Sequence, residues 1–247
     1  MGVCEIYQGT KGELWFTINR PEKRNAVNFE VMEGFERVIE MAEKTRPKAL
    51  MITGSGDQAF CSGGDLSVFH NLYTEEEAYS MLSKMAGILS RLLLLPIPTV
   101  AVLNGVALGG GCEIAAACDF RMVHKRAKAG FIQGNLGITT GWGGGNMLLE
   151  KLSVQQAMKL LAGAKIHSAS ELLDIGFADA VYDENLSEMV ENILEKEAGV
   201  LSAYKQMLIH KWSAASLPYR IEMEVQNCAR LWATEEHHQK VRGFLKK

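Results

Sequence analysis

The sequence is poor in cysteine, and its cysteines show no paired spacing. Five cysteines are scattered along 247 residues, which argues against a disulfide framework and against a zinc site built on C-x-x-C pairs. This usage is typical of a protein from a reducing compartment. We expect Cys112 and Cys118 to pack as small apolar side chains, and we predict no metal site.

Long apolar runs and basic clusters are absent as well. The longest apolar run, 92–103, contains Pro96 and Pro98 and is too short to span a bilayer. The first residues show no cationic start followed by an apolar core, so we expect no signal peptide. The formal net charge is -3, and the lack of a long basic run argues against a nucleic-acid surface. We therefore predict a cytoplasmic protein with a small-molecule partner and no membrane or nucleic-acid partner.

The composition fits one sizeable globular unit. Hydrophobic residues make up 47% of the chain and charged residues 22%, as in soluble globular proteins. No linker, low-complexity segment or fixed-period repeat divides the chain. We predict a core domain at 1–195 and a C-terminal helical region at 196–247.

Hydrophobic periodicity predicts alternating strands and helices in the first part of the chain. Two glycine-rich segments, 54–65 and 125–145, are expected to be loops. Strands are expected at 3–9, 13–19, 49–53, 98–103 and 119–123, and helices at 28–45, 75–95, 146–161, 168–173, 184–197, 201–214 and 218–245. On the last of these segments, which is polar, we expect His237 and His238 to face solvent.

The segment 105–119 passes from an apolar strand pattern through three glycines into a helix of small residues. Glycines let a ligand approach main-chain N–H groups that a side chain would shield. At a helix N-terminus these groups are free donors, and the helix dipole favours negative charge there. The segment is therefore a candidate oxyanion hole. The alternative is that the glycines only allow close packing of a buried helix.

Glu113 follows this glycine triplet in a segment made of Ala, Ile, Cys and Gly. A carboxylate in such surroundings is costly unless it is paired or neutral. We interpret Glu113 as a proton donor or orienting group of an active site. The alternative is a structural acid that main-chain donors hold in place.

Five motifs occur in one order along nearly the whole chain: NRPxxxNA at 19–26, FCSGGDL at 60–66, ALGGGCE at 107–113 with CD at 118–119, GxxxGxGG at 137–144, and IGFADAV at 175–181. Together they resemble the crotonase superfamily, the enoyl-CoA hydratase/isomerase family. The resemblance implies an α/β fold, a spiral of ββα units whose C-terminal helices cover the site, and a homotrimer or a dimer of trimers.

The resemblance also implies an acyl-CoA substrate. Its thioester oxygen would be bound by the backbone N–H groups of Gly64 and Gly110, and no metal or redox cofactor would be needed, because such a hole stabilises an enolate by itself. Trp142 would form a wall of the acyl pocket, or serve only in packing. The residues expected to border the coenzyme A portion are Arg24, Asn25, Ala26, Gly63, Asp65, Leu66 and Gly109.

One position departs from the hydratase pattern. Hydratases of this family use two glutamates, and Gln133 stands where the spacing to Gly137 and Gly141 places the second one. An amide can bind water or a carboxylate, but it cannot exchange a proton near neutral pH. We therefore expect weak hydration activity. The alternative for Gln133 is a loop residue that satisfies backbone groups.

The segments 118–122, 136–144 and 161–166 look most like the ethylmalonyl-CoA and methylmalonyl-CoA decarboxylase branch of the family. Loss of CO₂ from a malonyl thioester generates the enolate directly, so no base is required and one carboxylic acid suffices. We predict decarboxylation of a short 2-alkylmalonyl-CoA, with enoyl-CoA hydration or isomerisation as the alternative. A non-catalytic CoA-binding or scaffold protein is a further alternative, against which the buried Glu113 argues.

Overall fold

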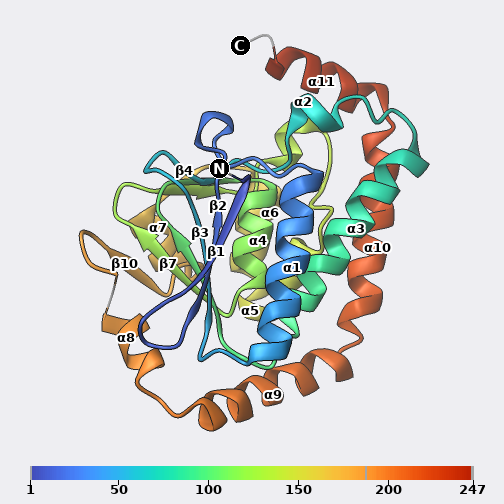
Figure 1. Ribbon diagram of the computed structural model, residues 1–247. Helices are drawn as coiled ribbons and strands as arrows, with labels where there is room; N and C mark the ends of the chain where they lie inside the picture. The colour runs from blue at the N-terminus through green and yellow to red at the C-terminus, as the bar shows by residue number, and fades with distance from the viewer. Residues whose placement is uncertain (1, 187, 246–247) are drawn as a thin grey trace.

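Two β-sheets and a layer of helices make up the computed structural model, which describes residues 2–186 and 188–245 (Figure 1). The larger sheet has the strand order β1-β2-β3-β5-β7-β10, and the smaller has the order β4-β6-β8-β9. The strands are β1 (Cys4–Gln8), β2 (Leu14–Ile18), β3 (Leu50–Gly54), β4 (Ala59–Cys61), β5 (Thr99–Leu103), β6 (Val106–Leu108), β7 (Phe120–His124), β8 (Lys128–Gly130), β9 (His167–Ser168) and β10 (Ala180–Tyr182).

The helices lie mainly to one side of the sheets. In Figure 1, α1, α3 and α10 stand beside one another, and α11 lies near α2 at the end of the molecule opposite α9. None of the described helices combines the length and hydrophobicity needed to cross a membrane. The helices are η1 (Pro21–Lys23), α1 (Phe29–Thr45), α2 (Leu66–Phe69), α3 (Glu75–Leu93), α4 (Gly110–Ala117), η2 (Gln133–Leu136), α5 (Gly144–Lys151), α6 (Val154–Gly163), α7 (Ala169–Ile175), α8 (Glu188–Leu194), α9 (Ala198–Ala214), α10 (Leu217–Trp232) and α11 (Glu235–Leu245).

From β3 to β8, successive strands alternate between the two sheets. β3, β5 and β7 are neighbours in the larger sheet, and β4, β6 and β8 follow the same order in the smaller sheet. Helices α3, α4 and α5 follow these three strand pairs in turn. This arrangement is the predicted spiral of ββα units. Because β4 and β6 pair in parallel, with Cys61 opposite Ala107, the chain leaves both strands at the same edge of the smaller sheet.

Local sequence explains several of these elements. Asn28 caps α1 by accepting a hydrogen bond from the amide of Val31, and Thr74 and Glu77 form a reciprocal capping box on α3. Apolar residues on one face of α1 and of α3 are fully buried, as the helical periodicity predicts. The strands predicted at 3–9 and 13–19 are also confirmed as β1 and β2, which pair antiparallel with Cys4 opposite Ile18.

The C-terminal helix α10 belongs to the main hydrophobic core. Its buried residues Ile221, Val225 and Ala229 lie in the same cluster as Met85 and Leu89 of α3, and Figure 1 shows the two helices running alongside each other. The boundary between 195 and 196 stays a prediction. The last helices are packed against the core and close one side of the site described below.

Several predictions about individual elements are wrong. The segments 54–65 and 125–145 are not wholly loops, because they contain β4 and β8, short strands that exist through pairing with β6. The segment 146–161 is divided into α5 and α6, since Ser153 caps a new helix. The segment 218–245 likewise forms two helices, with a break at residues 233–234. Local patterns did not indicate these breaks because each side of the break is itself helical.

Candidate active site

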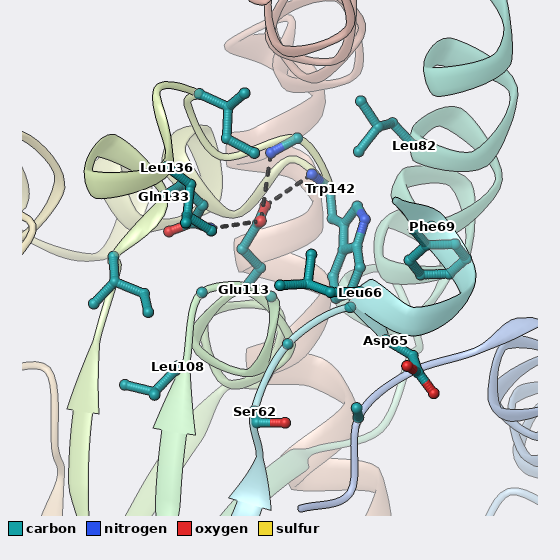
Figure 2. A pocket seen from close by; sticks show the side chains of 18 of the residues that line it. Ser62, Asp65, Leu66, Phe69, Leu82, Leu108, Glu113, Gln133, Leu136 and Trp142 are labelled. Atoms are coloured by element: carbon teal, nitrogen blue, oxygen red, sulfur yellow. Dashed lines mark hydrogen bonds between the residues drawn. The ribbon is translucent and has the colours of Figure 1, made fainter. Parts of the chain in front are cut away.

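A cavity of about 310 Å³ lies where β4 and β6 end. Its walls are largely apolar and come from distant parts of the chain, including Phe69, Leu82, Leu136, Trp142, Trp232 and Phe244. Figure 2 shows the cavity from close by. Of the residues predicted to form a site, it is lined by Arg24, Ala26, Gly63, Gly64, Asp65, Leu66, Gly109, Gly110, Glu113, Gln133 and Trp142.

The turns that follow β4 and β6 bring two backbone amides into this cavity lining. Gly64 lies just after β4, and Gly110 is the first residue of α4. The turns are in contact, because a Cβ atom on Gly63 would lie 3.3 Å from the amide nitrogen of Gly110. Within the described residues, neither the Gly64 nor the Gly110 amide donates a hydrogen bond to another protein group. Two backbone N–H groups without a protein partner therefore belong to residues that line the same cavity.

The indole of Trp142 packs against both turns. A Cβ atom on Gly110 would lie 2.1 Å from Cζ3 of Trp142, and one on Gly64 would lie 3.6 Å from Cζ2. Only glycine fits at position 110 while the ring keeps its place. In Figure 2 the indole lies between Glu113 and Phe69. Trp142 is therefore a wall of the cavity as well as a packing residue.

Glu113 projects from the first turn of α4 and is only 2% exposed. Its Oε2 accepts hydrogen bonds from the amides of Trp142 at 2.8 Å and Gly144 at 3.0 Å. Its Oε1 accepts one from Nε2 of Gln133 at 2.9 Å and a longer one from the amide of Gly141 at 3.4 Å. Main-chain donors thus orient this acid, which still lines the cavity. The two interpretations of Glu113, an active-site acid and an acid held by main-chain donors, are therefore compatible with each other.

The surroundings of Glu113 favour its protonated form. Burial is the main cause that raises the pKa of Glu113 from 4.5 to about 8, and the negative charge of Glu224 adds to it. The amides of Gly144, Trp142 and Gly141 oppose this shift. Within the described part of the chain, no Lys, Arg or His forms an ion pair with Glu113. A carboxylic acid that holds its proton near neutral pH can act as a proton donor.

Gln133 begins the short helix η2 and is 8% exposed. Its Nε2 donates to Glu113, whereas its Oε1 is buried and has no hydrogen-bond partner in the described residues. A buried oxygen without a partner is costly. The side chain forms its hydrogen bond with Glu113 rather than with backbone groups, so an acid and an amide lie side by side here.

Two residues predicted to bind the ligand have side chains that form contacts within the protein instead. Asn25 lies outside the cavity lining; it is fully buried and donates to the carbonyl oxygens of Ser55 and Ala59. Asp65 lines the cavity, but its carboxylate pairs with Arg20 at 2.8 Å and caps α2. The side chains of both residues are therefore engaged within the protein.

Sequence reasoning missed two features of the last helices. The expectation of a solvated His237 is wrong: this side chain is 2% exposed, and its Nδ1 lies 2.8 Å from the carbonyl oxygen of Leu136, because α11 folds back onto η2. Glu224 of α10 was not singled out, although it lies on the same helical face as Ile221 and Val225. An acid on an apolar face is the signal that could have found it.

Fold and cavity together agree with the comparisons to known proteins. The sequence model of the enoyl-CoA hydratase/isomerase family matches residues 10–247, so the chain belongs to this family. The ethylmalonyl-CoA decarboxylase of Mus musculus is 37% identical over 200 residues, which cover 79% of this chain and 62% of the mouse protein. The match thus spans less than two thirds of that relative. The short-chain-enoyl-CoA hydratase of Clostridium acetobutylicum is 30% identical over 237 residues, covering 94% of this chain and 90% of that protein.

Solved structures show the same fold. An enoyl-CoA hydratase/isomerase from Xanthobacter autotrophicus Py2 superposes with a TM-score of 0.89 at 20% identity and covers 100% of this chain and 94% of its own. The enoyl-CoA hydratase from Bacillus halodurans gives a TM-score of 0.87 at 23% identity, with coverage of 98% and 100%. The predicted fold class is confirmed.

Proposed function

We propose that the protein decarboxylates a short 2-alkylmalonyl-CoA. In this proposal, the amides of Gly64 and Gly110 bind the thioester oxygen and stabilise the enolate that forms when CO₂ leaves. Glu113 then donates its proton to the enolate carbon. The reaction draws on no metal or redox cofactor. The identity to the mouse ethylmalonyl-CoA decarboxylase supports this substrate class.

One observation carries the proposal: the inner part of the cavity contains an acid beside an amide. Gln133 donates to Glu113 at 2.9 Å, and the carboxylate of Asp65 is engaged by Arg20. In hydration by two carboxylates, one group activates the water molecule and the other protonates the substrate. A single acid cannot serve both roles at once. Decarboxylation has no such need, because the electrons of the broken C–C bond form the enolate.

Protonation of Glu113 also gives Gln133 a role. When Glu113 carries its proton on Oε1, a half-turn of the Gln133 amide lets the Gln133 Oε1 accept a hydrogen bond from the carboxyl group of Glu113. This bond gives the Gln133 oxygen a partner. The substrate carboxylate lies in the same cavity, which Gln133 also lines. The apolar wall formed by Trp142 and Leu82 keeps water from this carboxylate, which favours loss of CO₂.

The direct test is a parallel assay of methylmalonyl-CoA, ethylmalonyl-CoA and crotonyl-CoA, with each acyl-CoA followed by mass. Loss of 44 mass units, about one CO₂, from a malonyl thioester with little water addition to crotonyl-CoA is the expected result. Rapid hydration of crotonyl-CoA without decarboxylation would overturn the proposal.

Enoyl-CoA hydration is the second candidate, favoured by the similarity to the Clostridium acetobutylicum hydratase over 94% of this chain. We expect the variant Gln133→Glu to raise the rate of crotonyl-CoA hydration by about tenfold or more, because it supplies a second proton-transfer group. The same variant should lower decarboxylation, since two neighbouring carboxyl groups repel the substrate carboxylate. Initial rates of hydration and of decarboxylation measure the expected gain and the expected loss. No gain in hydration would contradict our reason for preferring decarboxylation.

The proposal includes a homotrimer or a dimer of trimers. One face of α9 presents apolar side chains to solvent in the single chain, namely Val200, Tyr204, Met207 and Leu208. Such a continuous exposed face is typical of a surface that another subunit covers. Light scattering of the purified protein distinguishes these assemblies from a single chain.

A further inference from the structure

A second buried acid lies behind Glu113. Glu224 projects from α10 and is 9% exposed. Its Oε1 accepts a hydrogen bond from the amide of Gly145 at 3.1 Å, and its Oε2 accepts from the amide of Asn146 at 2.8 Å and from Nδ2 of Asn146 at 2.7 Å. Glu224 is thus oriented by main-chain and side-chain donors at the start of α5.

The two acids share the N-terminus of one helix. Glu113 accepts from the amides of Gly141, Trp142 and Gly144, and Glu224 accepts from the next two amides along the chain, those of Gly145 and Asn146. The first amides of α5 have no acceptor within the helix itself. The two carboxylates provide acceptors, Glu113 from α4 and Glu224 from α10. The segment 141–146, which carries the Trp142 wall, is therefore held between α4 and α10.

Little room exists for this segment to move. A Cβ atom on Gly144 would lie 2.5 Å from Cγ of Glu113, and a Cβ atom on Gly145 would lie 3.3 Å from Oε2 of Glu224. Asn146 adds a link to α10, since its Nδ2 also donates to the carbonyl oxygen of Arg220 at 3.1 Å. A shift of Glu224 would thus be transmitted to the main chain that orients Glu113.

We propose that Glu224 is a positioning residue for the reaction, which acts on the carboxyl group of Glu113 through the segment 141–146 and through its own negative charge. It does not line the cavity and is not a proton donor to the substrate. This inference deepens the proposed function. The activity measurements that test it rest on the proposed decarboxylation.

The charge of Glu224 is not neutralised nearby. In the described part of the chain no ion pair involves Glu224. Its negative charge therefore reaches Glu113 and opposes the ionisation of that acid. The titratable and charged groups on the elements packed around the two acids are otherwise engaged or neutral thiols: Cys112 on α4, Cys228 and Arg220 on α10, Tyr79 on α3, Glu150 and Lys151 on α5, Lys211 on α9 and His237 on α11.

The sign of the effect follows from these charges. The protonated form of Glu113 is present below its pKa of about 8 and is lost as the pH rises through that value. Removing the negative charge of Glu224 makes ionisation of Glu113 easier. In the variant Glu224→Gln, the midpoint at which activity falls on the alkaline side should therefore move down by about one pH unit.

The experiment measures kcat for methylmalonyl-CoA from pH 6 to about 9.5, which brackets the alkaline limb, in the wild type, Glu224→Gln and a matched control. The control is Glu222→Gln, which removes one negative charge from the same helix at a site bonded to Tyr79 and Gln226. We expect a lower midpoint for Glu224→Gln and an unchanged midpoint for the control. A uniform fall in kcat at every pH, with no shift of the midpoint, would overturn the proposal.

A third variant separates charge from geometry. Glu224→Asp keeps the charge but withdraws the carboxylate from the amides of Gly145 and Asn146, so kcat should fall with the midpoint unchanged. A second measurement needs no substrate: carbon-13 NMR of labelled glutamate side chains follows the titration of Glu113, whose signal is the one missing in Glu113→Gln. A lower midpoint in Glu224→Gln supports the inference even if no thioester is decarboxylated. Equal midpoints in both proteins would contradict it.

Discussion

Replacing Glu113 with glutamine should lower the rate of decarboxylation by about 10²–10⁴-fold, because the variant removes the acid that protonates the enolate. The fold should tolerate the change. The amide oxygen can accept from Trp142 and Gly144, as Oε2 of the acid does. The new amino group then faces Gln133, whose amide can turn to accept from it. Steady-state kinetics on methylmalonyl-CoA measure the loss.

The control for this variant is binding. Calorimetric affinity for coenzyme A and the melting temperature should stay close to those of the wild type, because no apolar contact is removed. A rate within about threefold of the wild type would show that another group supplies the proton, since a general acid contributes far more than that.

The second large effect is expected from Gly110→Ala. The added methyl group would lie 2.1 Å from Cζ3 of Trp142, so either the indole or the turn that carries the Gly110 amide must move. Loss of one oxyanion donor costs about 10²–10³-fold in turnover. We expect a decrease of that size in kcat, measured on the same thioesters.

Gly87→Ala is the matched control. A Cβ atom on Gly87 meets nothing within 4 Å, and the residue is an exposed position of α3. The same substitution there should leave activity unchanged and stabilise the helix by about 1 kcal/mol. Adding Trp142→Phe to Gly110→Ala shortens the ring that the methyl group meets, so partial recovery of kcat would identify the clash as the cause. Full activity of Gly110→Ala alone would contradict a role for this turn in catalysis.

The parts of the fold that the sequence predicted well are those with a long apolar periodicity. Helices α1 and α3 each bury one face over four or more turns, and their caps at Asn28 and Thr74 are local features. The strands β4 and β8 are only three residues long, in glycine-rich segments. They are strands because β6 lies between them, and nothing in three residues reports a partner that lies far along the chain.

Some features of the candidate site could likewise be predicted from the sequence, and others could not. The glycine turn and the buried acid could be inferred from the residues between Gly105 and Asp119. The contact between Gln133 and Glu113, across 20 positions, followed only from the resemblance in spacing. The amides of Trp142 and Gly144 could not be assigned to Glu113 from sequence, because main-chain groups carry no residue-specific signal. Burial of His237 depends on a change of chain direction at residues 233–234, which brings α11 against η2.

The single residue Gly109 joins β6 to α4, and this short connection limits how the protein can vary in length. One inserted residue would turn α4 by about 100° relative to the sheet. Glu113 would then leave the cavity while the helix itself stayed intact. Insertions between β6 and α4 should therefore abolish turnover and also destabilise the fold, because every residue of α4 is buried, whereas residues 195–197, between α8 and α9, have no such link to the cavity. Libraries that alter chain length can place their changes at the second connection and must spare the first.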